Sequence, residues 1–198
     1  MNTKKWLSTA VLVLIPACIG INFLGKSFAE ALHLPLWLDS IGTCLAACLA
    51  GPIVGAICGA ANNLIYGLTL SPISLVYALT SAAIGIVVGI LANKGQMRHI
   101  KGAILTSILA GLVAVIISTP LNVIFWGGMT GNTWGDAVYA WAVAQKLPMF
   151  IASFFDEMVV DIPDKIATIL IVFGIYKGLP KTLTSLYQSN DKIENLND

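Results

Sequence analysis

Eleven polar or aromatic residues stand near the ends of long apolar segments, where their side chains could bind a small molecule. Two are carboxylates, three are amides and six carry rings: Trp37, Asp39, Asn62, Asn63, Tyr66, Tyr77, Asn122, Trp126, Trp134, Tyr139 and Asp164. Carboxylates and amides hydrogen-bond a polar ligand, and aromatic rings cover a flat ring or a cation. Because polar groups in lipid normally face a cavity or one another, these residues predict a ligand pocket.

Other interpretations of the same residues stay open. Tryptophan and tyrosine are common at a membrane interface without touching a ligand. Asp39 could cap the helix that follows it. The acids from Asp156 to Asp164, with Lys165, could form an internal salt-bridge network, and His33 stands alone in a loop.

The sequence carries no constellation typical of catalysis. It contains neither a GxSxG nor an HExxH motif, and its four cysteines lie in apolar runs where we expect buried thiols rather than a metal site. Residues 20–27 match the phosphate-loop pattern GxxxxGK[ST], but they end an apolar helix and follow no strand. We therefore expect no enzyme, no cofactor and no metal.

Composition predicts an integral membrane protein. The chain has 198 residues, of which 57% are hydrophobic and 11% charged, whereas soluble domains carry about 25% charged residues. The net charge of +1 and the lack of a basic run give no sign of nucleic-acid binding. At about 20 residues per crossing, roughly six spans fit.

The central element is a hairpin over residues 37–68, which turns at Gly51-Pro52. Gly51, Gly55 and Gly59 recur every four residues. Glycine weakens a helix in water, but in lipid it lets two helix backbones approach closely. The stripe therefore predicts a face packed against another helix.

The remaining chain supplies the other spans. We expect an all-α membrane protein with spans near 6–23, 38–50, 52–67, 73–92, 102–126 and 163–178, with Pro163 in the first turn of the last. Residues 29–38 would be a loop, and 133–161 would form interfacial or half-buried helices broken at Pro148. Residues 1–182 would be the membrane domain and 183–198 a polar cytoplasmic tail.

Basic residues set the expected orientation. With both termini in the cytoplasm of this multi-pass cell-membrane protein, eight of the eleven basic residues fall inside: Lys4, Lys5, Lys94, Arg98, Lys101, Lys177, Lys181 and Lys192. The candidate ligand residues then lie in the outer half, which predicts a pocket open to the outside. Its acids and tryptophans favour a flat heterocycle that carries a positive charge or several donors.

Three sequence patterns stand out: the hairpin DSIGTCLAACLAGPIVGAICGAANNLIYGL, the arrangement WGDA…P…DIPDK, and the closing segment VDIPDKIATILIVFGIYKGLP. Together they resemble the substrate-binding S component of energy-coupling factor (ECF) vitamin transporters, and the resemblance covers about residues 5–182. The resemblance implies a subunit that captures a vitamin or related micronutrient outside the cell. It also implies partners, namely a coupling transmembrane subunit and two cytoplasmic ATPases that drive uptake, and a lid formed by 29–38.

Docking in this family often uses an Ala-x-x-x-Ala motif on the first span, where this sequence has Pro16, Ala17 and Gly20. Two alternatives belong to other classes: a stand-alone facilitator for small solutes, and a membrane sensor domain. The sequence shows no soluble output segment, which disfavours the sensor.

Overall fold

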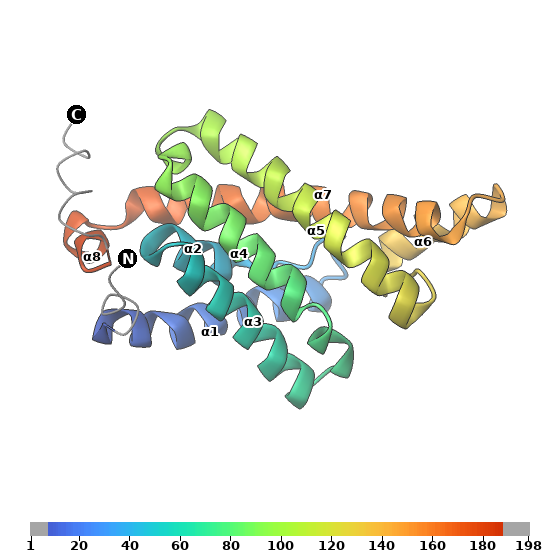
Figure 1. The fold of residues 1–198 in the computed structure, drawn as a ribbon, viewed down its shortest axis with the longest axis horizontal. Helices are drawn as coiled ribbons and strands as arrows, with labels where there is room; N and C mark the ends of the chain where they lie inside the picture. Colours follow the sequence, from blue (N-terminus) through green and yellow to red (C-terminus); the bar gives the residue numbers. More distant parts are fainter. Residues whose placement is uncertain (1–7, 188–198) are drawn as a thin grey trace.

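The computed structural model describes residues 8–187, which form helices and their connections without a strand (Figure 1). The elements are α1 (Thr9–Ala31), α2 (Ile41–Ala50), α3 (Pro52–Thr69), the short 3-10 helix η2 (Pro72–Leu75), α4 (Ala78–Asn93), the 3-10 helix η3 (Gln96–Arg98), α5 (Ile100–Trp126), α6 (Thr133–Ala144), α7 (Met149–Gly178) and α8 (Lys181–Ser185). The predicted all-α class is confirmed. Expectations about Lys4, Lys5 and Lys192, and about most of the tail, lie outside the described residues.

The glycine-proline hairpin is confirmed. Gly51 has a φ of 92°, a backbone conformation that suits glycine, and Pro52 opens α3 directly after it. The glycine stripe of α3 packs on α4: a Cβ added at Gly85 would lie 2.4 Å from the carbonyl carbon of Gly55, and one at Gly59 would lie 2.5 Å from the carbonyl oxygen of Ser81. Small residues thus set the α3–α4 distance.

A Gly85→Ala substitution should lower the free energy of unfolding by about 1–3 kcal/mol, because its methyl group would collide with the backbone of α3. Gly20→Ala is the matched control, since a Cβ there meets nothing within 4 Å. Thermal unfolding in detergent compares the two. Equal unfolding temperatures for both variants would contradict the close contact.

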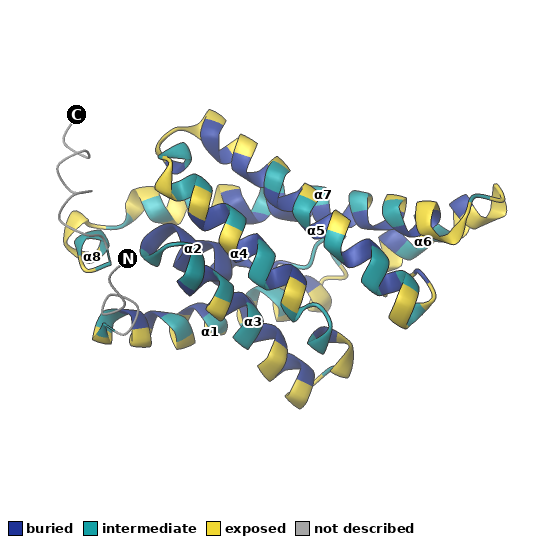
Figure 2. Ribbon diagram, viewed as in Figure 1, coloured by how far each residue is buried: buried dark blue, intermediate teal, exposed yellow. Residues whose placement is uncertain are grey.

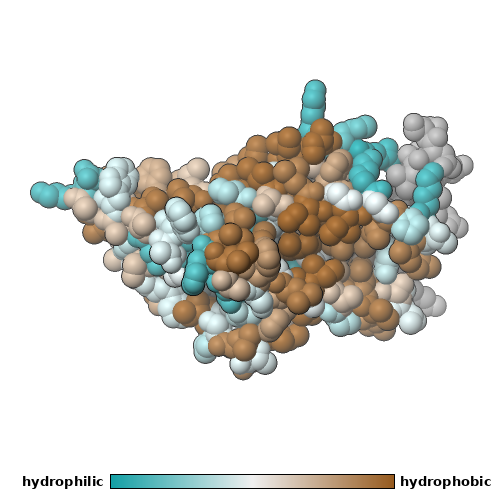
Figure 3. Space-filling model, turned by 180° about the vertical axis from the view of Figure 1, so that it is seen from behind, coloured by the Kyte–Doolittle hydropathy of each residue, from teal (hydrophilic) through white to brown (hydrophobic). Residues whose placement is uncertain are grey.

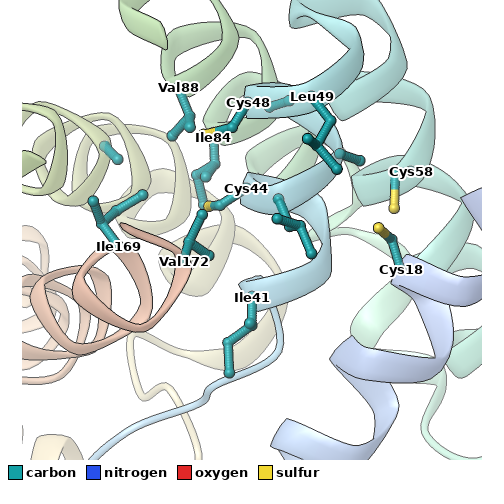
Figure 4. Packing of buried hydrophobic residues seen from close by; sticks show 14 of the residues in the cluster. Cys18, Ile41, Cys44, Cys48, Leu49, Cys58, Ile84, Val88, Ile169 and Val172 are labelled. Atoms are coloured by element: carbon teal, nitrogen blue, oxygen red, sulfur yellow. The ribbon is translucent and has the colours of Figure 1, made fainter. Parts of the chain in front are cut away.

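Helix α2 lies at the centre of the bundle, and residues 41–49 are all buried (Figure 2). In the core view, Cys44 and Cys48 of α2 lie among Ile84, Val88 and Val172, while the thiols of Cys18 and Cys58 face each other between α1 and α3 (Figure 4). All four cysteines are buried free thiols, as expected.

Two predicted helix boundaries are wrong: the end of the first helix and the start of the last membrane span. Helix α1 continues to Ala31, so the first loop begins at Leu32 rather than at residue 29, and the phosphate-loop-like sequence lies within this helix. Helix α7 passes through Pro163 without ending. The proline side chain is exposed, and α7 packs along α5 just before it, where a Cβ at Gly111 would come 2.8 Å from Ile162 Cδ1. Packing there outweighs the one hydrogen bond that proline removes. The predicted break at Pro148 is correct.

Two described helices, α1 and α5, are long and apolar enough to cross a membrane, while α2 and α4 are shorter apolar helices. The surface around the middle of the bundle is predominantly hydrophobic (Figure 3), with exposed side chains such as Leu24, Ile57, Ile86, Ile108 and Ile116. The number of six spans stays a prediction.

Candidate ligand-binding site

A cavity of about 210 Å³ lies at the end of the bundle away from the chain ends. The C-terminal halves of α1 and α3, the first turns of α4 and the middle of α7 form half of its wall, and η2, α5 and the connecting loops form the rest. The residues that line it are Lys26, Glu30, Trp37, Asp39, Asn63, Tyr66, Ser71, Ile73, Ser74, Tyr77, Thr80, Ser81, Ile84, Ala114, Ser118, Thr130, Gly131, Glu157, Asp161 and Lys165. Because Glu30, Ile73 and Gly131 are exposed, the cavity opens to the surface there.

One corner of the cavity joins α1 to α3. The Lys26 ammonium lies 4.0 Å from the centre of the Tyr66 ring and donates a hydrogen bond of 3.5 Å to Ser74 Oγ. The Tyr66 hydroxyl donates to the Glu30 carboxylate at 3.2 Å. Lys26 and Glu30 stand one turn apart on α1, so this corner carries one charge of each sign.

A hydrogen-bonded chain crosses from α4 to α7 behind the cavity. The Tyr77 hydroxyl donates to Asn122 Oδ1, and Asn122 Nδ2 donates to Glu157 Oε1. Asn122 itself is fully buried and does not line the cavity. It therefore holds two wall residues in place. Asn63, on the wall, donates to Ser81 Oγ and ties α3 to α4.

Asp164 anchors the first loop to α7. Its Oδ1 accepts the backbone N–H groups of Trp37 at 3.0 Å and of Leu38 at 2.8 Å, and Lys165 Nζ donates to its Oδ2. Leu38 has a φ of 51°, which is unfavourable for a residue with a side chain, so the two hydrogen bonds hold a strained backbone. Lys165 Nζ also lies 3.9 Å from Asp161 Oδ1.

The loop between α5 and α6 closes over the same end. Thr130 donates from its hydroxyl and its backbone N–H to Asp156, at 3.0 and 3.2 Å. The Trp134 indole N–H donates to the carbonyl of His33 at 3.4 Å, and Tyr139 donates to the carbonyl of Gly127 at 2.8 Å. Because Asn132 Nδ2 also donates to the carbonyl of Leu34 at 3.5 Å, the α5–α6 loop and the start of α6 both contact the first loop.

The structure brings five of the eleven candidate residues together on the cavity wall: Trp37, Asp39, Asn63, Tyr66 and Tyr77. The other six do not line it. Asn122 and Asp164 are buried behind it, Tyr139 and Trp134 support the loops, Trp126 is half-buried near the end of α5, and Asn62 is buried in α3 with a side-chain oxygen that accepts no hydrogen bond from the described residues.

Five charged wall residues were not among the candidates: Lys26, Glu30, Glu157, Asp161 and Lys165. Their spacing gives a signal, because Lys26 and Glu30 are four apart, as are Glu157, Asp161 and Lys165. Side chains four residues apart share one face of a helix. From the sequence alone, the second set is predicted only to form a salt-bridge network.

An all-helical bundle with an apolar outer surface and a charged cavity at one end is the architecture of a membrane protein that binds a small solute. The sequence profile of the family described as "ECF transporter, substrate-specific component" matches residues 10–186. The chain belongs to this family, which confirms the resemblance seen in the sequence. It is accordingly an integral membrane protein, the subunit of an ECF transporter that binds a small-molecule substrate and works with the membrane and ATPase subunits. No curated protein and no solved structure matches it.

Proposed function

We propose that this chain captures a vitamin or a related heterocyclic micronutrient in the cavity, on the extracellular side, for ATP-driven uptake. The cavity at one end of the bundle is the observation that carries this proposal. The rings of Trp37, Tyr66 and Tyr77 would cover a flat ligand, and Asn63 and Asp39 would bond its polar edge.

The charges at the two ends support an outward-facing cavity. Basic residues at the turn from α4 to α5 and at the end of α7 lie at the opposite end of the bundle: Lys94, Arg98, Lys101, Lys177 and Lys181. Because cytoplasmic loops are rich in lysine and arginine, that end would face the cytoplasm. Both described chain ends lie there as well.

The proposed docking face for the coupling subunit is the small-residue surface of α1. Pro16, Ala17 and Gly20 are all exposed, and nothing within 4 Å would meet a Cβ at Gly20. Small exposed residues let another helix approach closely within the membrane.

Uptake into cells tests the proposal. The chain would be expressed with and without the membrane and ATPase subunits, and accumulation of labelled vitamins would be measured. We expect uptake to require the ATPases. Equal uptake in their absence would overturn the proposal in favour of a stand-alone facilitator. Mass spectrometry of small molecules that co-purify with the chain in detergent would identify the ligand.

A Gly20→Phe variant tests the docking face. We expect ATP-dependent uptake to fall several-fold while the purified subunit retains as much co-purifying ligand as the wild type, because a ring at this position would hold the partner helix away without reaching the cavity. Gly174→Phe on α7 is the control, since a Cβ there also meets nothing within 4 Å. Equal uptake by both variants would exclude Gly20 from the interface.

A further inference from the structure

We propose that the cavity selects a small organic cation, a ring that carries a fixed positive charge or a protonated amine, and that Asp39, Glu157 and Asp161 neutralise this charge. The proposal rests on the proposed function and names the chemical class of its ligand.

The first argument is the balance of charges in the wall. Four carboxylates (Glu30, Asp39, Glu157 and Asp161) face two ammonium groups (Lys26 and Lys165). The positive charge of Lys165 is shared with a further carboxylate behind the wall, that of Asp164. Buried carboxylates are costly unless paired or hydrogen-bonded. Without a ligand, protons or solvent cations must balance the excess, and a cationic ligand would take their place.

The second argument is where the unbalanced charge lies. At the corner of α1 and α3, Lys26 and Glu30 offset each other, and both are held through Tyr66. The excess is therefore at the α7 side of the cavity. There Asp39 from the first loop lines the same cavity as Glu157 and Asp161 and interacts electrostatically with Asp161, and Lys165 is the one ammonium group in the cavity wall on that side.

The third argument is the hydrogen-bonding capacity left unused on that side. Asp161 is only 4% exposed and lines the cavity; its carboxylate shares a hydrogen bond with Glu157, and its nearest cation is Lys165 Nζ at 3.9 Å. Glu157 accepts from Asn122 at Oε1 and shares the hydrogen bond with Asp161, and Asp39 is half-buried in the first loop. An ionised carboxylate has about four acceptor sites, so these three groups can accept further hydrogen bonds from a ligand in the cavity. Charge-assisted N–H donors of a ligand would satisfy them.

The rings in the wall favour an organic cation over a bare metal ion. Trp37, Tyr66 and Tyr77 line the cavity, and aromatic faces attract a flat cation; because Lys26 already lies over the ring of Tyr66, Trp37 and Tyr77 are the rings left for a ligand cation. Within residues 8–187, no three carboxylate, histidine or cysteine side chains come together as a metal-binding set. A cationic ring would use both the rings and the carboxylates.

Competitive retention tests this inference. The purified full chain, in lipid nanodiscs, is dialysed against an equimolar mixture of two cations (thiamine and the methylnicotinamide cation), two neutral rings (nicotinamide and riboflavin) and two anions (nicotinate and pantothenate). Retained molecules are measured by mass spectrometry. The variant is Asp161→Asn. The control is Asp136→Asn, which removes one carboxylate outside the cavity wall and keeps an acceptor for the Gly131 N–H.

We expect the wild type to retain at least one cation, at least tenfold above the neutral and anionic rings. Asp161→Asn should lower that retention about tenfold and Asp136→Asn should leave it unchanged. If Asp161→Asn does not fold, Asp39→Asn, at a half-buried loop position, replaces it. Preferred retention of a neutral or anionic ring, or cation retention unaffected by either cavity variant, would overturn the inference and leave the binding role standing. Retention of no compound would overturn both.

Discussion

An Asp164→Ala variant is expected to lose about 3–5 kcal/mol of unfolding free energy, because it leaves the buried Lys165 ammonium without its closest partner. The same change removes the acceptor of the Trp37 and Leu38 N–H groups. The first loop would then lose the two hydrogen bonds that hold its strained backbone at Leu38. Thermal unfolding in detergent measures the first effect. Weaker ligand retention would report the second, since Trp37 lines the cavity.

Two further variants separate charge from hydrogen bonding at this anchor. Asp164→Asn keeps an oxygen for the loop N–H groups but removes the charge, so it should fall between the wild type and Asp164→Ala. Adding Lys165→Met to Asp164→Asn removes the unpaired ammonium and should restore part of the lost stability. An Asp164→Ala protein as stable as the wild type would show that Asp161 alone can neutralise Lys165.

The features predictable from sequence are those set by local chemistry. Gly51-Pro52 defines a turn because glycine accepts a φ of 92° and proline suits the first turn of α3. The glycine stripe predicted a tight helix contact, and the structure supplies its partner, Gly85 of α4. Partner identity was not predictable, since a stripe of small residues fits any helix that offers a similarly flat face.

The candidate site was harder to predict, because polarity and depth do not tell which side of a wall a residue occupies. Polar side chains in apolar segments make Asn122 and Asp164 candidate ligand contacts, yet both lie behind the wall and hydrogen-bond to residues that line it. Glu157 and Asp161 lie on the cavity because α7 continues through Pro163. A helix that began at Pro163, as the sequence predicts, would not include Glu157 and Asp161. In the structure these two residues share a helix face with Lys165.

Asp164 and Asn122 illustrate one physical principle. The cavity wall carries charges that would repel one another, and buried groups behind it hold two of these charged residues, Glu157 and Lys165, in fixed positions. Asp164 fixes the first loop and Lys165, while Asn122 fixes Tyr77 and Glu157. Fixed dipoles and charges avoid the cost of ordering the site when a ligand binds. Removing either residue should therefore affect binding more than its distance from the ligand suggests.

An Asn122→Leu variant should lower the free energy of unfolding by about 2–4 kcal/mol, although leucine keeps the branched shape of asparagine and its number of heavy atoms. The change leaves the Tyr77 hydroxyl and the Glu157 carboxylate each without its partner, and an unsatisfied buried polar group costs about 1–3 kcal/mol. Tyr77 and Glu157 both line the cavity. We therefore expect the affinity for the co-purifying ligand to fall by at least tenfold.

Asn62→Leu is the matched comparison for stability. Asn62 is also a buried amide in a helix, but its side-chain oxygen accepts no hydrogen bond from the described residues. Replacing Asn62 leaves no described residue without a hydrogen-bond partner. The unfolding temperature of the Asn62→Leu variant should therefore change little or rise. Because the two substitutions are chemically identical, any difference between them reports the hydrogen bonds of Asn122. Equal losses in both would mean that the chain from Tyr77 to Glu157 contributes nothing to the fold.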